Sequence, residues 1–315
     1  MSELLKKAKK EKRSLLMGDD QKLIPVKIPL DIPQLDSILG GGIPLGRMME
    51  IFGNWGVGKT YLAQIVIAAF QKKGYVAAYV DNESRYDPLW FQNTGIDISK
   101  LYVSQPSSGE DALDTVIFMI KEKIGVIVLD SIAALVPTSE LEGSMDDNQV
   151  AAQARMLNKA LRKIREANRA EEDSDYKGTA FIAINQMRSG IGPFTSYMLP
   201  GGQGQQYFAA ILLRVSKGPK FEEHGKKAGF YIKCHTEKNN LAEDHQECEL
   251  PFRLEGTIDT VMGLTEIALD LGIIVRKGPY FIYDEKKVMG KLALIEEIKL
   301  DKKLRKEIEE KIYKK

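Results

Sequence analysis

Cysteine is scarce in this sequence: its 315 residues contain only two, Cys234 and Cys248. Two cysteines cannot build a disulfide framework, and such low usage is typical of a reducing cytoplasm. His235 and His245 lie near them, but the sequence has no closely spaced cysteine pair of the kind that binds zinc. We therefore interpret the cysteines as buried strand residues and the histidines as exposed ones, without a zinc site.

Long apolar runs are absent as well, since no stretch reaches the length of a membrane-spanning helix. The start, MSELLKKAKKEKRSLL, is basic but lacks the apolar core and small-residue cleavage site of a signal peptide. The formal net charge is only +1, so any nucleic-acid site must be a local patch. We expect a cytoplasmic protein without a membrane partner.

A phosphate-binding loop is present in residues 53–60, which read GNWGVGKT. Glycines at this spacing let the backbone fold around an anion and aim its N–H groups at phosphate. Lys59 is placed to reach the terminal phosphates of a nucleotide, and the Thr60 hydroxyl to hold Mg²⁺. An apolar strand before the loop and the helical TYLAQIVIAAF after it supply the context that the motif needs. The predicted phosphate-binding residues are Gly53, Asn54, Trp55, Gly56, Val57, Gly58, Lys59 and Thr60.

Short apolar runs alternate with helical stretches across the middle of the chain. We predict strands at 48–53, 76–81, 100–105, 126–131 and 179–186, and helices at about 60–72, 109–123 and 149–170. Near-continuous apolar strands between helices indicate an α/β fold with a buried, mostly parallel sheet. Strands at 209–217, 229–238 and 246–254 follow one another without helices, so they predict an antiparallel extension.

The two ends of the chain differ from this core. We expect residues 2–16 to form a short basic helix with an apolar stripe, which must pack on the core or on another subunit. Residues 22–34 contain three prolines and are interpreted as an extended linker. A helix at 260–272, a hairpin at 278–290 and a charged terminal helix predict a small α+β domain. We expect an N-terminal helix and linker at residues 1–30, a core domain at 31–256 and a small C-terminal domain at 257–315.

Three polar residues follow predicted strands, at the sheet edge where parallel sheets bind ligands. Asp130 ends VIVLD and is placed to hold Mg²⁺ beside the phosphate loop. Glu83 lies just past another strand, where a carboxylate could activate water, although a lone loop glutamate is usually only solvated. Gln186 ends FIAINQ, and its amide could bond a terminal phosphate. Tyr86 or Trp90 could stack on a nucleobase, the alternative being ordinary packing.

The order of these motifs resembles the RecA-type DNA recombinases. The resemblance is carried by GIPLGRMMEIFGNWGVGKT, YVDNESRYDPLW, LYVSQPSSGEDAL, VIVLDSIAALVPTSELEGSMDD, QARMLNKALRKI, INQMRSGIG and PGGQGQQYFAAILLRV. It spans the whole core and is far more specific than a phosphate loop alone. It implies a RecA-like P-loop ATPase core, with an N-terminal polymerisation helix and a small C-terminal domain. It also implies ATP and Mg²⁺ as cofactors, single- and double-stranded DNA as partners, and a helical homo-oligomeric filament.

The resemblance also implies roles for particular residues. Glu83 would activate water, Asp130 would hold magnesium and Gln186 would sense the γ-phosphate. Asp87 and Trp90 fall where the family contacts and stacks on adenine. The family's filament places ATP between subunits, with a pair of lysines reaching in from the neighbour. Lys238 in TEKNN matches the first of them, whereas the second position is Asn240, which carries no charge.

The helix at 149–170 gives a check on DNA binding that does not depend on the family. Its apolar positions 150, 154, 157, 161 and 164 share one stripe, and a basic stripe lies roughly 150° away. A merely solvated basic face is the alternative; the resemblance matches Arg155 and Arg162 to phosphate-contacting arginines. Two loops would face DNA, at about 140–149 and 187–202. The predicted DNA-binding residues are Arg155, Lys159, Arg162, Arg188, Ile191, Phe194, Gly201 and Gly202.

These observations predict an ATP-dependent recombinase that polymerises on single-stranded DNA and catalyses homologous pairing and strand exchange. Few base-reading side chains are evident, so binding should be largely indifferent to sequence and sensitive to salt. Two alternatives stay open at this point. One is a ring-forming hexameric motor of the same core fold, such as a helicase. The other is a mediator that binds ATP and DNA but exchanges no strands, which the presence of Glu83 disfavours.

Overall fold

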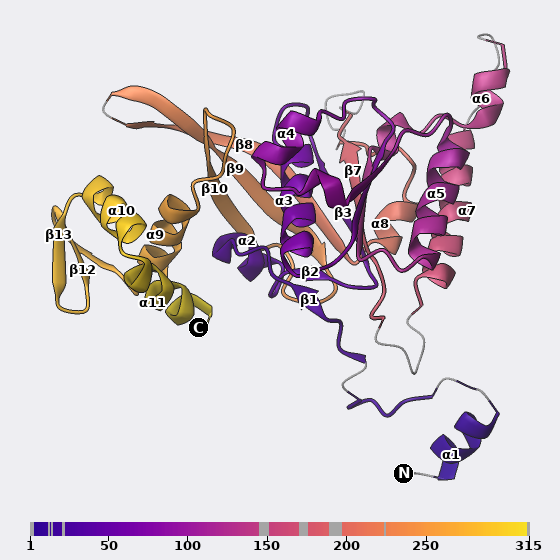
Figure 1. The fold of residues 1–315 in the computed structure, drawn as a ribbon, viewed down its shortest axis with the longest axis horizontal. Helices are drawn as coiled ribbons and strands as arrows, with labels where there is room; N and C mark the ends of the chain where they lie inside the picture. The colour runs from indigo at the N-terminus through magenta and orange to yellow at the C-terminus, as the bar shows by residue number, and fades with distance from the viewer. Residues whose placement is uncertain are drawn as a thin grey trace.

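A large mixed sheet forms the centre of the molecule (Figure 1). The computed structural model describes residues 3–11, 13, 15–20, 23–144, 151–169, 176–188, 197–223 and 225–313. In this part of the chain the sheet has eight strands in the order β10-β9-β8-β3-β7-β6-β4-β5. Their bounds are β3 Met48–Gly53, β4 Ala77–Asp81, β5 Leu101–Ser104, β6 Val126–Asp130, β7 Ala180–Gln186, β8 Ile211–Glu223, β9 Lys226–Asn239 and β10 Glu247–Arg253.

Parallel pairing dominates this sheet, as the apolar runs predicted. Strands β5, β4, β6, β7, β3 and β8 pair in parallel, and β9 and β10 then add antiparallel. The predicted antiparallel extension is therefore confirmed, with the refinement that β8 itself joins β3 in parallel. β8 and β9 are longer than predicted. Their outer halves are polar and lack the alternating apolar pattern from which a strand is predicted.

Helices cover both faces of the sheet (Figure 1). On one face α3 (Lys59–Lys72) and α4 (Pro88–Asn93) bury side chains such as Phe70 and Phe91. On the other face α5 (Gly109–Lys121) and α7 (Ala152–Ala167) bury side chains such as Val116 and Leu161. Each fully buried aliphatic side chain contributes about 1.5–3 kcal/mol relative to exposure, so the two layers fix the sheet between them.

Shorter elements complete the core. They are α6 Thr138–Glu142, α8 Gly204–Phe208, and two 3₁₀ turns at Ile98–Lys100 and Ile132–Ala134. At the N-terminal side, β1 (Lys27–Ile28) pairs with β2 (Ile43–Pro44), and α2 (Pro33–Ile38) lies between them. Ile28 and Leu30 are buried in the same cluster as the sheet, so the expected linker is packed along this part of its length.

The first helix, α1 (Glu3–Lys10), is shorter than the predicted 2–16. Figure 1 shows it apart from the sheet and its covering helices. Among the described residues, no helix has the combination of length and apolarity that crossing a membrane requires.

The C-terminal elements form their own cluster beside the β8–β9–β10 side of the sheet (Figure 1). They are α9 Thr260–Asp270, β11 Val275–Lys277, β12 Tyr280–Tyr283, β13 Lys286–Met289, α10 Lys291–Leu300 and α11 Lys302–Tyr313. The expected helix, hairpin and terminal helix are present, but the hairpin gains a third strand. The terminal helix is divided at Asp301, whose side chain accepts hydrogen bonds from the N–H groups of Lys303 and Leu304 and so begins a new helix.

Candidate functional site

Four neighbouring strands bring their polar ends to one edge of the sheet. Gly53 of β3 pairs with Gln186 of β7, and Asp81 of β4 pairs with Asp130 of β6. The order β3-β7-β6-β4 makes these four ends adjacent. The phosphate loop leaves from Gly53, so the sequence motifs meet where parallel sheets bind their ligands.

The phosphate loop is already closed around its own lysine. Lys59 Nζ donates to the carbonyl oxygens of Gly53 at 3.1 Å and Asn54 at 2.6 Å. Gly58 has φ +95°, and a Cβ there would lie 2.8 Å from Ile232 Cδ1, so glycine is required at this turn. Within the loop Val57 is buried, whereas the Trp55 side chain projects outward and is 89% exposed.

Asp130 lies beside the first turn of α3. Its Oδ2 accepts hydrogen bonds from Thr60 Oγ1 and from Tyr79 Oη, both at 2.8 Å. A hydroxyl and a carboxylate at contact distance are hard oxygen donors of the kind that Mg²⁺ binds. The donor set therefore fits the predicted metal, with Thr60 and Asp130 as the residues that would hold it.

Glu83 is the centre of a second group of contacts. Its Oε1 accepts hydrogen bonds from Ser131 Oγ at 2.7 Å and from Gln186 Nε2 at 2.8 Å. Its Oε2 lies 3.0 Å from Arg85 Nη1. Asp81 holds the backbone beneath, since its Oδ1 accepts from the N–H of Glu83 at 3.2 Å. The residue predicted to activate water and the residue predicted to sense phosphate are thus bonded to each other.

Burial sets the electrostatics of this edge. It lowers the pKa of Lys59, an effect that the nearby carboxylates of Asp130 and Glu83 oppose. Burial also raises the pKa of Asp130, against the hydrogen bonds that Tyr79 and Thr60 donate to it. A cation in the loop and carboxylates beside it form a mixed-charge site, which suits a metal-bound polyphosphate.

The residues expected near the nucleobase have structural contacts of their own. Tyr86 packs edge-to-face on Phe91 with ring centroids 4.7 Å apart. Asp87 begins α4, because its Oδ1 accepts from the N–H groups of Leu89 and Trp90 at 2.9 and 3.3 Å. Trp90 is half exposed, so it keeps a free face, whereas Tyr86 is engaged in the core.

The predicted basic helix is present as α7, and its two faces divide as the pattern indicated. Leu157 and Leu161 are buried against the sheet. The cations on the other face, Arg155, Lys159 and Arg162, are all exposed. Position 150 of the apolar stripe lies outside the described residues, as do positions 145–149 of the first predicted loop.

The second predicted loop begins and ends on described residues. Arg188 and Met198 exchange two backbone hydrogen bonds of 2.9 Å, which bring its ends together. Gly201 has φ +91°, and a Cβ there would lie 2.7 Å from Leu157 Cδ2 of α7; Gly202 also has a positive φ. The loop therefore returns directly onto the basic helix. Ile191 and Phe194 lie outside the described residues.

Lys238 is occupied within its own chain. Its Nζ donates to the carbonyl oxygens of Gln206, Tyr207 and Ala209, at 3.0, 3.1 and 2.6 Å. These carbonyls belong to the end of α8, so Lys238 acts as a C-terminal cap for that helix. Asn240 follows the end of β9, and its N–H donates to the Ala210 carbonyl at 2.9 Å.

Sequence reasoning missed three residues that organise the edge: Asp81, Tyr79 and Ser131. Asp81 ends a buried strand just as Asp130 does, so its position carried the same signal. Tyr79 is buried within its strand, and only the fold shows that its hydroxyl meets Asp130. Ser131 follows Asp130 directly, but its bond to Glu83 joins residues 48 positions apart.

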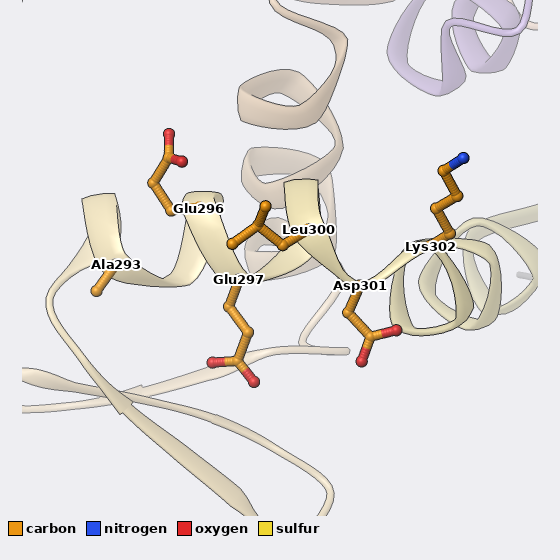
Figure 2. Close-up of a pocket in the computed structure, with 6 residues that line it drawn as sticks. All are labelled: Ala293, Glu296, Glu297, Leu300, Asp301 and Lys302. Atoms are coloured by element: carbon orange, nitrogen blue, oxygen red, sulfur yellow. The ribbon is translucent and has the colours of Figure 1, made fainter.

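Two other features do not form part of this site. Cys234 and Cys248 face each other across β9 and β10, and no metal-binding cluster occurs among the described residues. Figure 2 shows a surface pocket at the end of α10, lined by Ala293, Glu296, Glu297, Leu300, Asp301 and Lys302. Three of these six carry carboxylates, which would repel a phosphate, and the pocket lies on the C-terminal elements rather than at the sheet edge.

Comparison with known proteins identifies the family to which this sequence is similar. The family described as RecA N-terminal domain matches residues 4–258. "Protein RecA" of Thermus aquaticus is 39% identical over 305 residues, covering 94% of this chain and 87% of that protein. "Protein RecA" of Aquifex aeolicus is 40% identical over 268 residues, covering 83% and 75%. "Protein RecA" of Mesomycoplasma hyopneumoniae strain 7448 is 37% identical over 327 residues, covering 99% and 94%. On the family match and on these near full-length identities, the chain belongs to the RecA family.

Proposed function

We propose that this chain assembles along single-stranded DNA as a helical filament, with ATP between subunits, and pairs that strand with a homologous duplex. Membership of the RecA family makes the chain a DNA recombinase and a DNA-dependent ATPase. The filament, the metal and the roles of single residues are the further content of the proposal. The geometry of the sheet edge supports the metal and the roles of the residues there, and membership of the RecA family supports the filament.

The nucleotide phosphates would lie in the loop Gly53–Thr60, on backbone N–H groups and at the positive end of α3. Lys59 would exchange its bonds to Gly53 and Asn54 for the terminal phosphates. Thr60 and Asp130 would hold Mg²⁺. When bound, the metal would neutralise negative charge on the phosphate oxygens. Asp87 and Trp90 would contact adenine, with Tyr86 as their support.

Hydrolysis would use Glu83 as the group that accepts a proton from water. Two hydrogen bonds to Oε1, from Ser131 and Gln186, fix the direction of this carboxylate. A γ-phosphate would compete with Glu83 for the Gln186 amide. Binding of ATP would therefore change the hydrogen bonding of Gln186, at the point where β7 leads into the loop 187–202.

DNA would lie along the exposed cations of α7, with Arg188 and the glycines at 201 and 202 at the return of the second loop. Arg155, Lys159 and Arg162 are on one exposed face, which suits a backbone of regularly spaced phosphates. We assign Ile191 and Phe194 to wedge between bases. Because the contacts are to phosphate, affinity should fall steeply with salt.

The remaining assignments concern assembly. Residues 1–30 would pack on the adjacent subunit, 31–256 would form the ATPase core, and 257–315 the small C-terminal domain. Lys238 would reach the nucleotide of a neighbouring subunit, which requires it to leave the carbonyls of α8. The cytoplasmic location expected from the sequence remains part of this proposal.

The hydrogen bond between Gln186 and Glu83 is the observation that carries the proposal, because it joins the catalytic carboxylate to the strand that leads into the DNA loop. The test is a DNA strand-exchange assay with ATP, together with ATP hydrolysis measured with and without single-stranded DNA. We expect strand exchange and a large stimulation of hydrolysis by DNA. Equal hydrolysis rates with and without DNA, and no assembly along it, would contradict the proposal. Closed hexameric rings seen by electron microscopy would point to a motor instead.

A further inference from the structure

Arg85 places a positive charge at the catalytic carboxylate that no sequence motif accounts for. Its Nη1 lies 3.0 Å from Glu83 Oε2, whereas Ser131 and Gln186 donate to the other carboxylate oxygen, Oε1. The two donors to Oε1 are neutral, whereas Arg85 is a cation. Glu83 therefore has a charged partner in direct contact, and that partner comes from its own segment between β4 and α4.

The ion pair is strongly asymmetric in its exposure. The Glu83 side chain is 13% exposed, whereas that of Arg85 is 77% exposed. Pairs with an exposed partner stabilise a fold by only about 0–1 kcal/mol, so the protein does not depend on this contact for folding. For the same reason the guanidinium can leave Glu83 at little cost when a more highly charged anion arrives.

The backbone that carries Arg85 is held on both sides. Asp81 Oδ1 accepts from the N–H of Glu83 at 3.2 Å, and its Oδ2 accepts from the N–H of Tyr86 at 2.9 Å. Ser84, between them, adopts φ +54°. The backbone of Arg85 is thus fixed at the sheet edge, while its guanidinium is exposed to solvent. This arrangement suits a side chain that exchanges one anion for another.

The charges around the site leave room for such a cation. On the proposed function, Lys59 leaves its two carbonyls to contact the terminal phosphates from the loop, and Lys238 serves the nucleotide of a neighbouring subunit. Asn240 is neutral where the resemblance implies a lysine. Phosphoryl transfer spreads negative charge over three oxygens, and a planar guanidinium can donate two parallel hydrogen bonds to such a group.

We infer that Arg85 is a catalytic residue whose guanidinium moves from Glu83 to the γ-phosphoryl oxygens and stabilises the transition state of hydrolysis from within the same subunit. The water oxygen forms a bond to the γ-phosphorus as the bond from that phosphorus to the β–γ bridging oxygen breaks. The electron pair stays on the ADP oxygen, and Glu83 accepts the proton of the water. This inference rests on the proposed ATPase and names a further residue for it.

The first test is steady-state ATP hydrolysis with single-stranded DNA for Arg85→Gln and Arg85→Lys. The matched control is Arg169→Gln. Arg169 lies just beyond the C-terminal end of α7 and is another exposed arginine paired with a glutamate, Glu166. Arginines in this role contribute about 10³–10⁵ in kcat, so we expect Arg85→Gln to lose about 10²-fold or more. KM should change little, Arg85→Lys should fall between, and Arg169→Gln should match the parent. A kcat within about twofold of the parent for Arg85→Gln would overturn the inference.

The second test separates stabilisation of the transition state from positioning of Glu83. Binding of ADP and of ADP with aluminium fluoride is measured by calorimetry in Mg²⁺ for the parent and for Arg85→Gln. We expect the affinity for the aluminium fluoride complex to fall by a factor similar to the loss in kcat, while the affinity for ADP is unchanged. A loss in kcat with unchanged binding of both would show that Arg85 acts only through Glu83, and the inference would be wrong. Binding is measured without turnover, in the presence and in the absence of single-stranded DNA, so this outcome is distinct from a failure of the proposed function.

Discussion

The nucleotide edge of the sheet and the exposed face of α7 are built in opposite ways. At the nucleotide edge, Lys59, Asp130 and Glu83 already have hydrogen-bonded partners within the chain. On α7, Arg155 and Arg162 are exposed cations on a helix that is anchored from its other side. The nucleotide edge is therefore preorganised by contacts among its own side chains. The α7 face instead presents exposed cations on a helix that is packed against the core.

This contrast indicates what each region contributes. Preorganised groups act on charge that develops during a reaction and lose their effect when one member is removed. Exposed cations act additively on a polyanion, and each one is worth little alone. Substitution of a catalytic group at the nucleotide edge should therefore abolish a step, whereas each substitution on α7 should only reduce the affinity for DNA. The predictions below test that difference.

The largest effect is expected from Glu83→Gln, which removes the proton acceptor but keeps a side chain of the same shape. A general base contributes about 10²–10⁴ in rate, so ATP turnover with single-stranded DNA should fall by that factor. Nucleotide binding, measured by calorimetry, should stay close to that of the parent. The control is Glu122→Gln, on an exposed residue at the end of α5. Unchanged turnover would break the comparison and favour a non-catalytic mediator.

The second prediction concerns Glu50, which links the two regions. Asn185 Nδ2 donates to Glu50 Oε1 at 2.8 Å and to the carbonyl of Pro200 at 3.1 Å, so β3 is tied to the end of the second loop. Burial raises the pKa of Glu50 from 4.5 to about 7, an effect that the Asn185 hydrogen bond opposes. The folded chain therefore holds a proton between pH 4.5 and 7 that the unfolded chain releases. The free energy of unfolding should fall by about 3 kcal/mol as pH rises through this window.

Glu50→Gln imitates the protonated acid and should remove the contribution of Glu50 to the pH dependence of stability. Denaturant unfolding of both proteins at pH 5 and pH 8 measures it. The two proteins should be similar at pH 5, and the variant should be the more stable one at pH 8. Equal slopes in the two proteins would show that folding leaves the pKa of Glu50 unchanged.

A smaller effect is expected on α7. Arg155→Ala with Arg162→Ala should weaken binding of single-stranded DNA by roughly 10-fold and reduce the slope of log affinity against log salt by about 1 to 2. Fluorescence anisotropy at several salt concentrations gives both quantities. Lys163→Ala is the matched control, because Lys163 lies 3.9 Å from Asp114 of α5. Full DNA affinity in the double variant would discredit α7 as the DNA-facing helix.

The smallest effect is expected from Tyr79→Phe, which removes one donor from Asp130 and leaves Thr60 in place. A single hydrogen bond of this kind contributes about 1 kcal/mol, so stability should drop by that order. The Mg²⁺ concentration needed for half-maximal nucleotide binding should rise a few-fold, because Asp130 is less well oriented. Tyr102→Phe, on an exposed tyrosine, is the control. An unchanged Mg²⁺ dependence would show that the Tyr79 hydrogen bond to Asp130 does not contribute to metal binding.

The sequence predicted the elements well where local signals were strong. The phosphate loop, Asp130 and the basic stripe of α7 follow from spacing alone, since residue order determines them directly. The contacts of Glu83 and Lys238 could not be predicted in this way. Ser131 and Gln186 reach Glu83 from strands far along the chain, and Lys238 meets α8 only after β8 and β9 have paired. Which partner a polar side chain finds depends on the assembled sheet rather than on its neighbours in sequence.

The capping of α8 by Lys238 gives isolated copies of this chain a built-in restraint. On the proposed cross-subunit role, the Lys238 ammonium group cannot contact a neighbour's nucleotide while three carbonyls at the end of α8 in its own chain hold it. Releasing it leaves the end of α8 without its cap, a loss that new subunit contacts must offset. Isolated subunits in solution would therefore hydrolyse little ATP, and hydrolysis would occur where neighbouring subunits are assembled.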